Sequence, residues 1–127
     1  MDKDASGLNT SRLERAKALH DAGGVDAALA KGILPSFADL TLAEAVVLGL
    51  LRQEVRTYLC VLGHGSTEVG EVLRVYASAG VVRVCGLRNE IEATHAAAAL
   101  RWVTGEKAAV VASSGRASAA SRSCVSA

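Results

Sequence analysis

Short apolar runs alternate with helical patterns over most of the chain. Each run is continuous, which is typical of a strand buried on both faces of a parallel sheet. Strands are predicted near residues 57–62, 81–86 and 107–112, and helices over residues 42–53, 68–79 and 90–103. Because helices and strands alternate with short connections, right-handed crossovers are expected. The predicted fold class is α/β, with a three-layer αβα arrangement around a parallel sheet.

The chain before these elements has a pattern of its own. Residues 1–38 are predicted to form a helical leader or linker that packs on the sheet domain. Its polar start is expected to be frayed, with the helix beginning near residue 9. Ser11 and Glu14 have the spacing of a capping box. The glycine pair Gly23-Gly24 is expected to end this helix.

The sheet domain is predicted to cover residues 39–114 and to begin with a capped helix. Thr41 and Glu44 again have the spacing of a capping box. The helix that follows shows a broad apolar face, made of Leu42, Ala45, Val46, Leu48, Gly49 and Leu50. Residues 115–127 are rich in Ser, Ala and Arg and fit neither a helix face nor a strand, so an irregular tail is expected there.

The composition argues against several classes of function. Fourteen Lys and Arg against thirteen Asp and Glu leave a net charge of +1, and aromatic residues make up 3% of the chain. This argues against a nucleic-acid or acidic-membrane binder and against a base-stacking platform. The three cysteines form no C-x-x-C pair, so neither a disulfide framework nor a zinc site is expected. No apolar run nears the roughly 20 residues of a membrane span, and the start lacks a secretory signal, so a cytoplasmic location is expected.

Candidate chemistry lies where the strands end, because parallel α/β sheets bind ligands at their carboxyl edge. The segments predicted there are Gly63–Ser66, Gly86–Glu90 and Ser113–Gly115. Glu90 stands at the start of a helix, where the helix dipole alone favours an acidic residue by about 0.3–1 kcal/mol. Taken alone, that is a sufficient explanation for this glutamate.

The residues around Glu90 favour a functional explanation. The segment that contains it resembles the cofactor-glutamate segment of thiamine-diphosphate enzymes related to acetolactate synthase, which carries Arg, a polar residue and Glu, then His-Ala-Ala. The matching residues here are Arg88-Asn89-Glu90 and His95-Ala96-Ala97. Upstream, Gly63-His64-Gly65 resembles the Gly-His-Gly loop of the trihydroxycyclohexanedione hydrolases. The resemblance covers roughly residues 39–114 and implies the first half of a pyrimidine-binding domain.

The resemblance implies that Glu90 is a catalytic residue. In the family this carboxyl hydrogen-bonds N1′ of the cofactor's aminopyrimidine and favours the tautomer that takes the proton from thiazolium C2. It also implies that Gly63, His64, Gly65 and Thr94 lie at the thiamine diphosphate. Simpler interpretations stay open: a solvated turn for His64, a tight turn for the two glycines and helix packing for Thr94. No metal ligand is expected, because a second domain holds the family's Mg²⁺ and diphosphate.

Three further side chains of chemically reactive types are expected to have structural roles. His95 is predicted to cap a buried polar position. Cys60 and Cys85 lie inside apolar strands and are expected to be inert, buried thiols. None of them is therefore placed among the catalytic or metal-binding candidates.

The sequence departs from the family after the third strand. The family has Gly-Pro-Gly there, whereas this chain reads Ser113-Ser114-Gly115-Arg116, and it contains no Gly-Asp-Gly motif for magnesium and diphosphate. This favours a truncated or frame-shifted product that is inactive alone, with a separately encoded partner subunit as the alternative. The expected partners are thiamine diphosphate and either a second cofactor-binding domain or an oligomer partner. A small non-enzymatic α/β interaction or ligand-binding module is the competing class of function.

Overall fold

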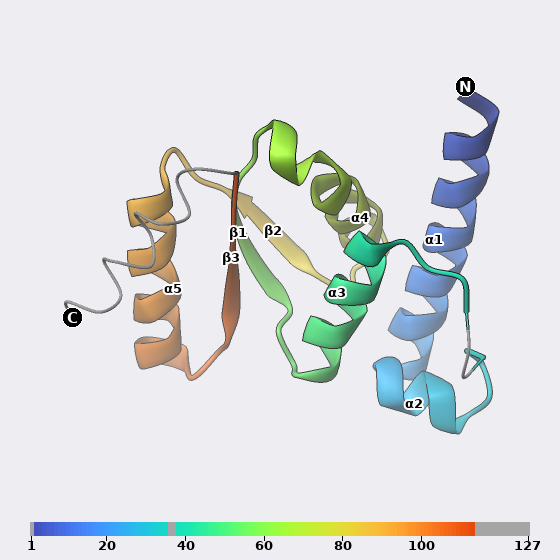
Figure 1. Ribbon diagram of the computed structural model, residues 1–127. Coiled ribbons are helices and arrows are strands. Elements are labelled where there is room, and N and C mark those ends of the chain that lie inside the picture. The colour runs from blue at the N-terminus through green and yellow to red at the C-terminus, as the bar shows by residue number, and fades with distance from the viewer. Residues whose placement is uncertain (1, 36–37, 114–127) are drawn as a thin grey trace.

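Three parallel strands form the centre of the protein. The computed structural model describes residues 2–35 and 38–113, and the predicted tail over 115–127, with Cys124, lies outside them. The strands are β1 (Thr57–Val61), β2 (Arg83–Gly86) and β3 (Ala108–Ala112), in the spatial order β2-β1-β3 (Figure 1). Both pairings are parallel. The prediction of an α/β fold with a parallel sheet is therefore confirmed.

Helices lie on both faces of this sheet. They are α1 (Asp2–Ala22), α2 (Val25–Ala30), α3 (Leu42–Arg52), α4 (Thr67–Ser78) and α5 (Glu90–Thr104), with a 3₁₀ turn η1 (His64–Ser66) before α4. Helix α5 packs on β3 and β1, α4 packs on the opposite face beside α3, and α1 and α2 lie outside that pair (Figure 1). Within the described residues, none of the helices combines the length and hydropathy needed to cross a bilayer.

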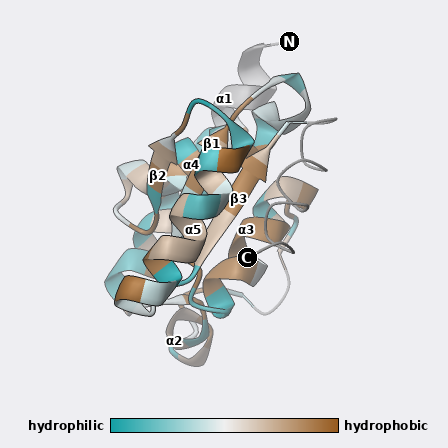
Figure 2. Ribbon diagram, turned by 90° about the vertical axis from the view of Figure 1, so that its left-hand side faces the viewer, coloured by the Kyte–Doolittle hydropathy of each residue, from teal (hydrophilic) through white to brown (hydrophobic). Residues whose placement is uncertain are grey.

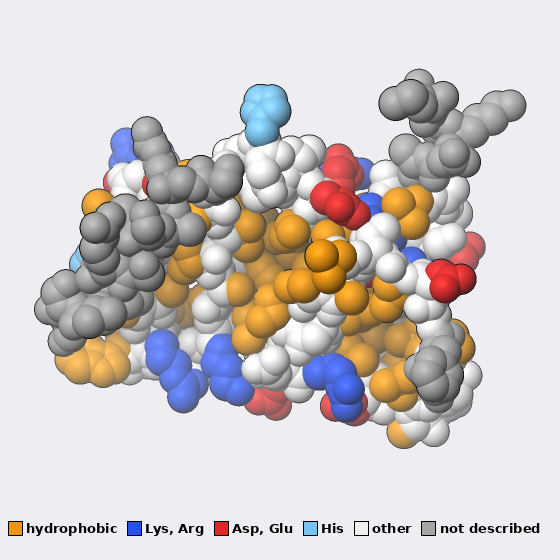
Figure 3. Space-filling view, in the orientation of Figure 1, with side chains coloured by type: hydrophobic (Ala, Val, Ile, Leu, Met, Phe, Trp, Pro, Cys, Tyr) orange, Lys and Arg blue, Asp and Glu red, His pale blue; other side chains and the backbone are white. Residues whose placement is uncertain are grey.

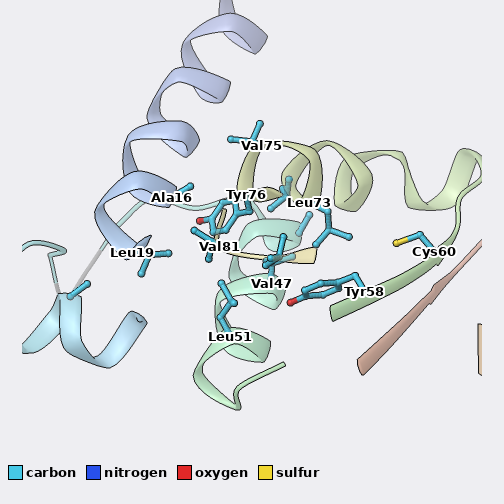
Figure 4. Close-up of a cluster of buried hydrophobic side chains, with 14 of the residues drawn as sticks. Ala16, Leu19, Val47, Leu51, Tyr58, Cys60, Leu73, Val75, Tyr76 and Val81 are labelled. Carbon is cyan, nitrogen blue, oxygen red and sulfur yellow. The ribbon is translucent and has the colours of Figure 1, made fainter. Parts of the chain in front are cut away.

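The main core lies between the sheet and helices α1, α3 and α4. Tyr58 and Cys60 of β1 project into it, and the register places Tyr58 opposite Val84 of β2 and Ala109 of β3. The buried side chains that meet them include Ala16, Leu19, Val47, Leu51, Leu73, Val75, Tyr76 and Val81 (Figure 4). The N-terminal helix thus contributes to the same core as the sheet.

Strand β2 is not buried on both faces as its apolar sequence predicted. Val81 and Val82 are buried just before it, but every residue of the strand itself is exposed. The reason is its place at the edge of the sheet, beyond the part that α5 covers. The expectation that Cys85 is a buried thiol is wrong for the same reason.

Helix α1 begins earlier than predicted. It starts at Asp2, and Ser11 lies inside it, donating its hydroxyl to the Gly7 carbonyl oxygen at 3.2 Å instead of capping a terminus. A polar first turn lacks apolar periodicity, so the pattern could not detect it, although no proline interrupts the helix. Gly23, with a φ of 87°, ends α1 as predicted. Thr41 caps α3 as predicted, since its Oγ1 accepts from the Glu44 N–H at 3.3 Å. The Glu44 carboxylate, however, bonds Arg15 and Tyr76 and does not complete a capping box.

The buried face of α3 differs from the predicted apolar face. The helix buries Ala43, Glu44, Val47 and Leu51, whereas Leu42 is 81% exposed. Apolar residues occupy most of α3 (Figure 2), so hydrophobicity alone did not select one side. Figure 3 shows the result, with hydrophobic side chains gathered on the surface over α3 and the adjoining sheet.

Candidate functional site

The three strands end at one edge of the sheet, where the candidate residues were predicted. The turn after β2 is tied to the central strand, because the Leu87 N–H donates to the Cys60 carbonyl oxygen at 2.9 Å. The register of β3 places Ala112 opposite Val61, so this strand ends beside β1. The segments after β1 and β2 and the residue after β3 therefore start from the same edge (Figure 1).

The turn after β1 is closed by a serine. Ser66 Oγ accepts from the Gly63 N–H at 3.1 Å and donates to the Gly63 carbonyl oxygen, also at 3.1 Å. A Cβ added to Gly63 would lie 2.5 Å from Ser113 Oγ, a separation that atoms do not tolerate. Gly63 therefore lets the end of β3 approach the end of β1. The space beside it is filled by Ser113, so this glycine has a structural role here.

Glu90 is the first residue of α5 and lies directly beyond the turn that follows β2. Asn89 caps the helix, its Oδ1 accepting from the Glu92 N–H at 2.9 Å. The Glu90 residue is only 5% exposed, and within the described residues its carboxylate makes no hydrogen bond and no ion pair. Glu92, in the same helical turn, is exposed.

The burial of Glu90 is not explained by the helix dipole alone. The dipole stabilises an acidic side chain in the first turn without requiring that it be buried, as Glu92 illustrates. Burying an ionisable group away from water is unfavourable unless a partner compensates it. Glu90 therefore lies at the sheet edge, and its carboxylate accepts no hydrogen bond from the described residues.

The other predicted cofactor residues are placed differently. Thr94 is buried one turn beyond Glu90, and its hydroxyl donates to the Glu90 carbonyl oxygen at 2.8 Å. His64 and Gly65 are exposed in η1. The structure thus groups Glu90 and Thr94 on the buried side of α5 and leaves the other two facing solvent. The prediction for His95 is wrong, because its exposed ring bonds the Ile91 carbonyl oxygen of its own helix at 2.8 Å.

An open groove of about 700 Å³ adjoins this edge on the other face of the sheet. Its lining includes Leu62 at the end of β1, Gly70 and Ala77 of α4, and Val84 of β2, with His64 at the same site. Glu90 is not among its lining residues. The groove and the buried carboxylate are therefore separate features.

A buried ion cluster, which the sequence interpretation missed, joins α1, α3 and α4. Glu44 is fully buried and accepts two hydrogen bonds from Arg15, at 2.8 and 2.9 Å. Tyr76 donates its hydroxyl to the same carboxylate at 2.9 Å, and Arg12 Nε lies 3.5 Å from it. The available signal was a single acidic residue on the otherwise apolar helix α3, opposite two arginines three residues apart in α1.

This cluster sets the ionisation of Glu44. Burial alone would raise its pKa, but the hydrogen bonds from Arg15 and Tyr76 and the charges of Arg15 and Arg12 outweigh that effect and hold the pKa below its ordinary value. Burial, followed by the nearby Glu44 charge, raises the pKa of Tyr76. Glu44 is therefore an anion at neutral pH. The cluster also explains the orientation of α3, because a rotation of the helix that buried Leu42 would move the Glu44 carboxylate away from Arg15 and Tyr76.

The two described cysteines are expected to differ in reactivity. Burial, together with the nearby Cys85, raises the pKa of Cys60 to about 11, whereas Cys85 is exposed on β2. In a Cys124→Ser variant at pH 8, a disulfide reagent should modify Cys85 at least about 100-fold faster than Cys60, because the thiolate is the reactive form. Absorbance of the released thiol measures both rates. Adding Cys85→Ser should remove the fast phase, and a fast phase that persists would contradict the assignment.

Within residues 2–35 and 38–113, no group of three or more His, Cys, Asp or Glu side chains is arranged to hold a metal ion. Comparisons with protein-family models, curated proteins and solved structures find no match to this chain. Function is therefore inferred from the geometry of the residues and from the resemblance of the segment around Glu90.

Proposed function

We propose that residues 39–114 form part of a thiamine-diphosphate pyrimidine-binding domain, in an enzyme related to acetolactate synthase or trihydroxycyclohexanedione hydrolase. The observation that carries this proposal is the low exposure of Glu90, whose carboxylate has no partner among the described residues. The strand order β2-β1-β3 and the parallel crossovers provide a carboxyl edge of the kind that binds ligands in α/β sheets. The resemblance around Glu90 supplies the identity of the ligand.

The residues around Glu90 suit a hydrogen bond to a ring nitrogen. Asn89 fixes the start of α5 and Thr94 bonds the Glu90 carbonyl oxygen, so the backbone that carries the carboxylate is held at both ends of the first turn. The residue as a whole is only 5% exposed, and its carboxylate oxygens make no hydrogen bond within the described residues, so they can accept one from a ligand. Glu90 would hold or share a proton at the pyrimidine nitrogen, while the cofactor supplies the carbanion chemistry.

The other four proposed cofactor residues have different roles in this proposal: Gly63, His64, Gly65 and Thr94. Thr94 would help to position Glu90, because its hydroxyl bonds the Glu90 carbonyl oxygen. Gly63 would shape the sheet edge, because its lack of a side chain lets Ser113 lie against it. His64 and Gly65 are exposed at the same sheet edge, where they would face a substrate or a second domain. We propose that a second cofactor-binding domain, from another chain or another copy, holds the diphosphate and Mg²⁺.

The chain alone is expected to bind thiamine diphosphate weakly. One carboxylate and a few apolar side chains should give at best millimolar affinity, which corresponds to about −4 kcal/mol. In ¹H–¹⁵N spectra, millimolar thiamine diphosphate with Mg²⁺ should shift the amides around Asn89–Thr94, and Glu90→Gln should abolish these shifts. The matched control is Glu92→Gln, which changes an exposed glutamate in the same turn. No turnover of a 2-keto acid is expected.

Two results would contradict this proposal. Absence of any shift around Glu90 at millimolar cofactor would favour the non-enzymatic α/β module instead. Micromolar binding that survives Glu90→Gln would place the cofactor elsewhere in the protein. Diphosphate alone serves as the specificity control, because it lacks the pyrimidine and should leave these amides unchanged.

A further inference from the structure

A small cavity lies at the opposite edge of the sheet from Glu90. Its volume is about 180 Å³, and it opens where α1 ends and α2 begins. Arg56, directly before β1, and Val81, just before β2, belong to its lining. The cavity is therefore at the amino ends of the strands and is independent of the proposed cofactor site.

The floor of the cavity is apolar. Leu19, Leu51 and Val81 line it and are themselves buried, and Val25 of α2 completes the floor. Leu19 of α1, Leu51 of α3 and Val81 lie beside one another in Figure 4. This part of the cavity offers contact to a hydrocarbon group and no hydrogen-bonding side chain.

The rim of the cavity carries Arg56 and His20. Each lies over a glycine: Arg56 Nη2 is 3.8 Å from the position of a Cβ on Gly24, and the His20 ring is 3.4 Å from that of a Cβ on Gly80. Both glycines have positive φ values, of 146° and 74°, which side-chain-bearing residues rarely adopt. Because Gly24 and Gly80 have no side chains, the guanidinium of Arg56 and the imidazole of His20 can both line this cavity.

The guanidinium of Arg56 has no partner in the described part of the chain. It makes no side-chain hydrogen bond and no ion pair among residues 2–35 and 38–113. Two acidic residues flank the cavity lining in sequence. Asp26 is paired with Arg52, whose Nε lies 2.9 Å from Asp26 Oδ1. Asp21 is exposed and makes no ion pair with Arg56. A fork of N–H donors at the rim is therefore free to bind an anion from solution.

We propose that this cavity binds a short aliphatic carboxylate. The carboxylate would accept two hydrogen bonds from Arg56 and a further one from His20, while the hydrocarbon part would contact Leu19, Leu51 and Val81. A single water molecule needs only about 10–15 Å³ of such space, so a cavity of about 180 Å³ is large enough for a ligand of about six non-hydrogen atoms. Butyrate has that size and both chemical features. Inorganic phosphate lacks the hydrocarbon part, and 1-butanol lacks the anionic head.

Titration of the 127-residue chain with sodium butyrate, against sodium chloride at equal ionic strength, tests this proposal. The ¹H–¹⁵N signals of Gly23, Gly24 and Gly80 should shift in a saturable manner. Arg56→Met should weaken binding at least tenfold, whereas Arg88→Met, at the other edge of the sheet, should leave it unchanged. Both arginines are exposed, so neither change is expected to unfold the protein.

1-Butanol and inorganic phosphate test whether the site needs both an anionic head and a hydrocarbon part. 1-Butanol and phosphate should each bind at least tenfold more weakly than butyrate. Equal binding of phosphate and butyrate would overturn the assignment to a carboxylate with a hydrocarbon part. A lack of saturable shifts with butyrate, or an equal effect of Arg56→Met and Arg88→Met, would overturn the site itself.

Discussion

Replacing Glu44 by glutamine is expected to lower the free energy of unfolding by about 3–5 kcal/mol, because it removes the buried counter-charge of Arg15 and Arg12. Arg12 is 3% exposed, and Arg15 makes both of its side-chain hydrogen bonds to the Glu44 carboxylate. Glutamine keeps the volume of the side chain, so the loss would reflect charge and hydrogen bonding and not a cavity. Urea unfolding followed by circular dichroism at pH 7 measures it.

A matched control is available in Glu68→Gln. Glu68 lies 3.6 Å from Arg12, but its side chain is 60% exposed. Exposed ion pairs contribute about 0–1 kcal/mol, so this variant should unfold close to wild type. Equal losses in the two variants would show that burial of Glu44 does not determine the effect.

The stability difference should also depend on pH. The pKa of Glu44 is lowered in the folded protein, so its contribution is fully present above the ordinary value of about 4.3 and is lost as pH falls through the folded pKa. The gap in unfolding free energy between wild type and Glu44→Gln should therefore narrow as pH falls from 5 toward 2. A gap that stays constant over this range would contradict the assigned ion pairing.

Glu90→Gln is expected to reduce turnover about 10²–10⁴-fold when the chain is assembled with a second cofactor-binding domain, the range for removal of a proton-sharing group. The expectation rests on the proposed contact with the pyrimidine ring. Glutamine preserves the shape of the side chain and removes a charge that has no partner in the described residues, so the variant should be at least as resistant to urea as wild type. Steady-state turnover at saturating cofactor measures the effect.

Glu92→Gln provides the comparison for this prediction. It removes the same charge from the same helical turn at an exposed position, and it should leave turnover within about twofold if exposed charges there contribute little. Wild-type turnover in the Glu90→Gln assembly would refute the role of that carboxylate. Loss of turnover in both variants would indicate that only the charge at the start of α5 matters.

The strands and most helices could be predicted because their signals are local. The apolar runs of β1 and β3 and the periodicity of α4 and α5 are present within each segment, and the position of Glu90 at the start of α5 followed from them. The exposure of β2 could not be predicted in this way. It depends on which strand occupies the centre of the sheet, and the apolar sequence of an edge strand does not show that.

The rotation of α3 was missed because it depends on distant partners. The hydrogen bond from Arg15 to Glu44 joins residues 29 positions apart, and that from Tyr76 to Glu44 joins residues 32 apart. Local hydrophobicity favoured a face containing Leu42 and Val46, which the structure exposes. The exposure of His64 likewise depends on the turn that Ser66 closes, a contact visible only in three dimensions.

The position of α1 against α3 and α4 has a consequence for synthesis of the chain. Arg12 and Arg15 are made before Glu44 and Tyr76, and Tyr76 follows Arg12 by 64 residues (76 minus 12). At about 5–20 residues per second, that interval lasts roughly 3–13 s. During it the buried cluster around Glu44 is incomplete, and most of the stability of a helix in a protein comes from tertiary packing. Helix α1 is therefore expected to reach its final position only after α4 has been made.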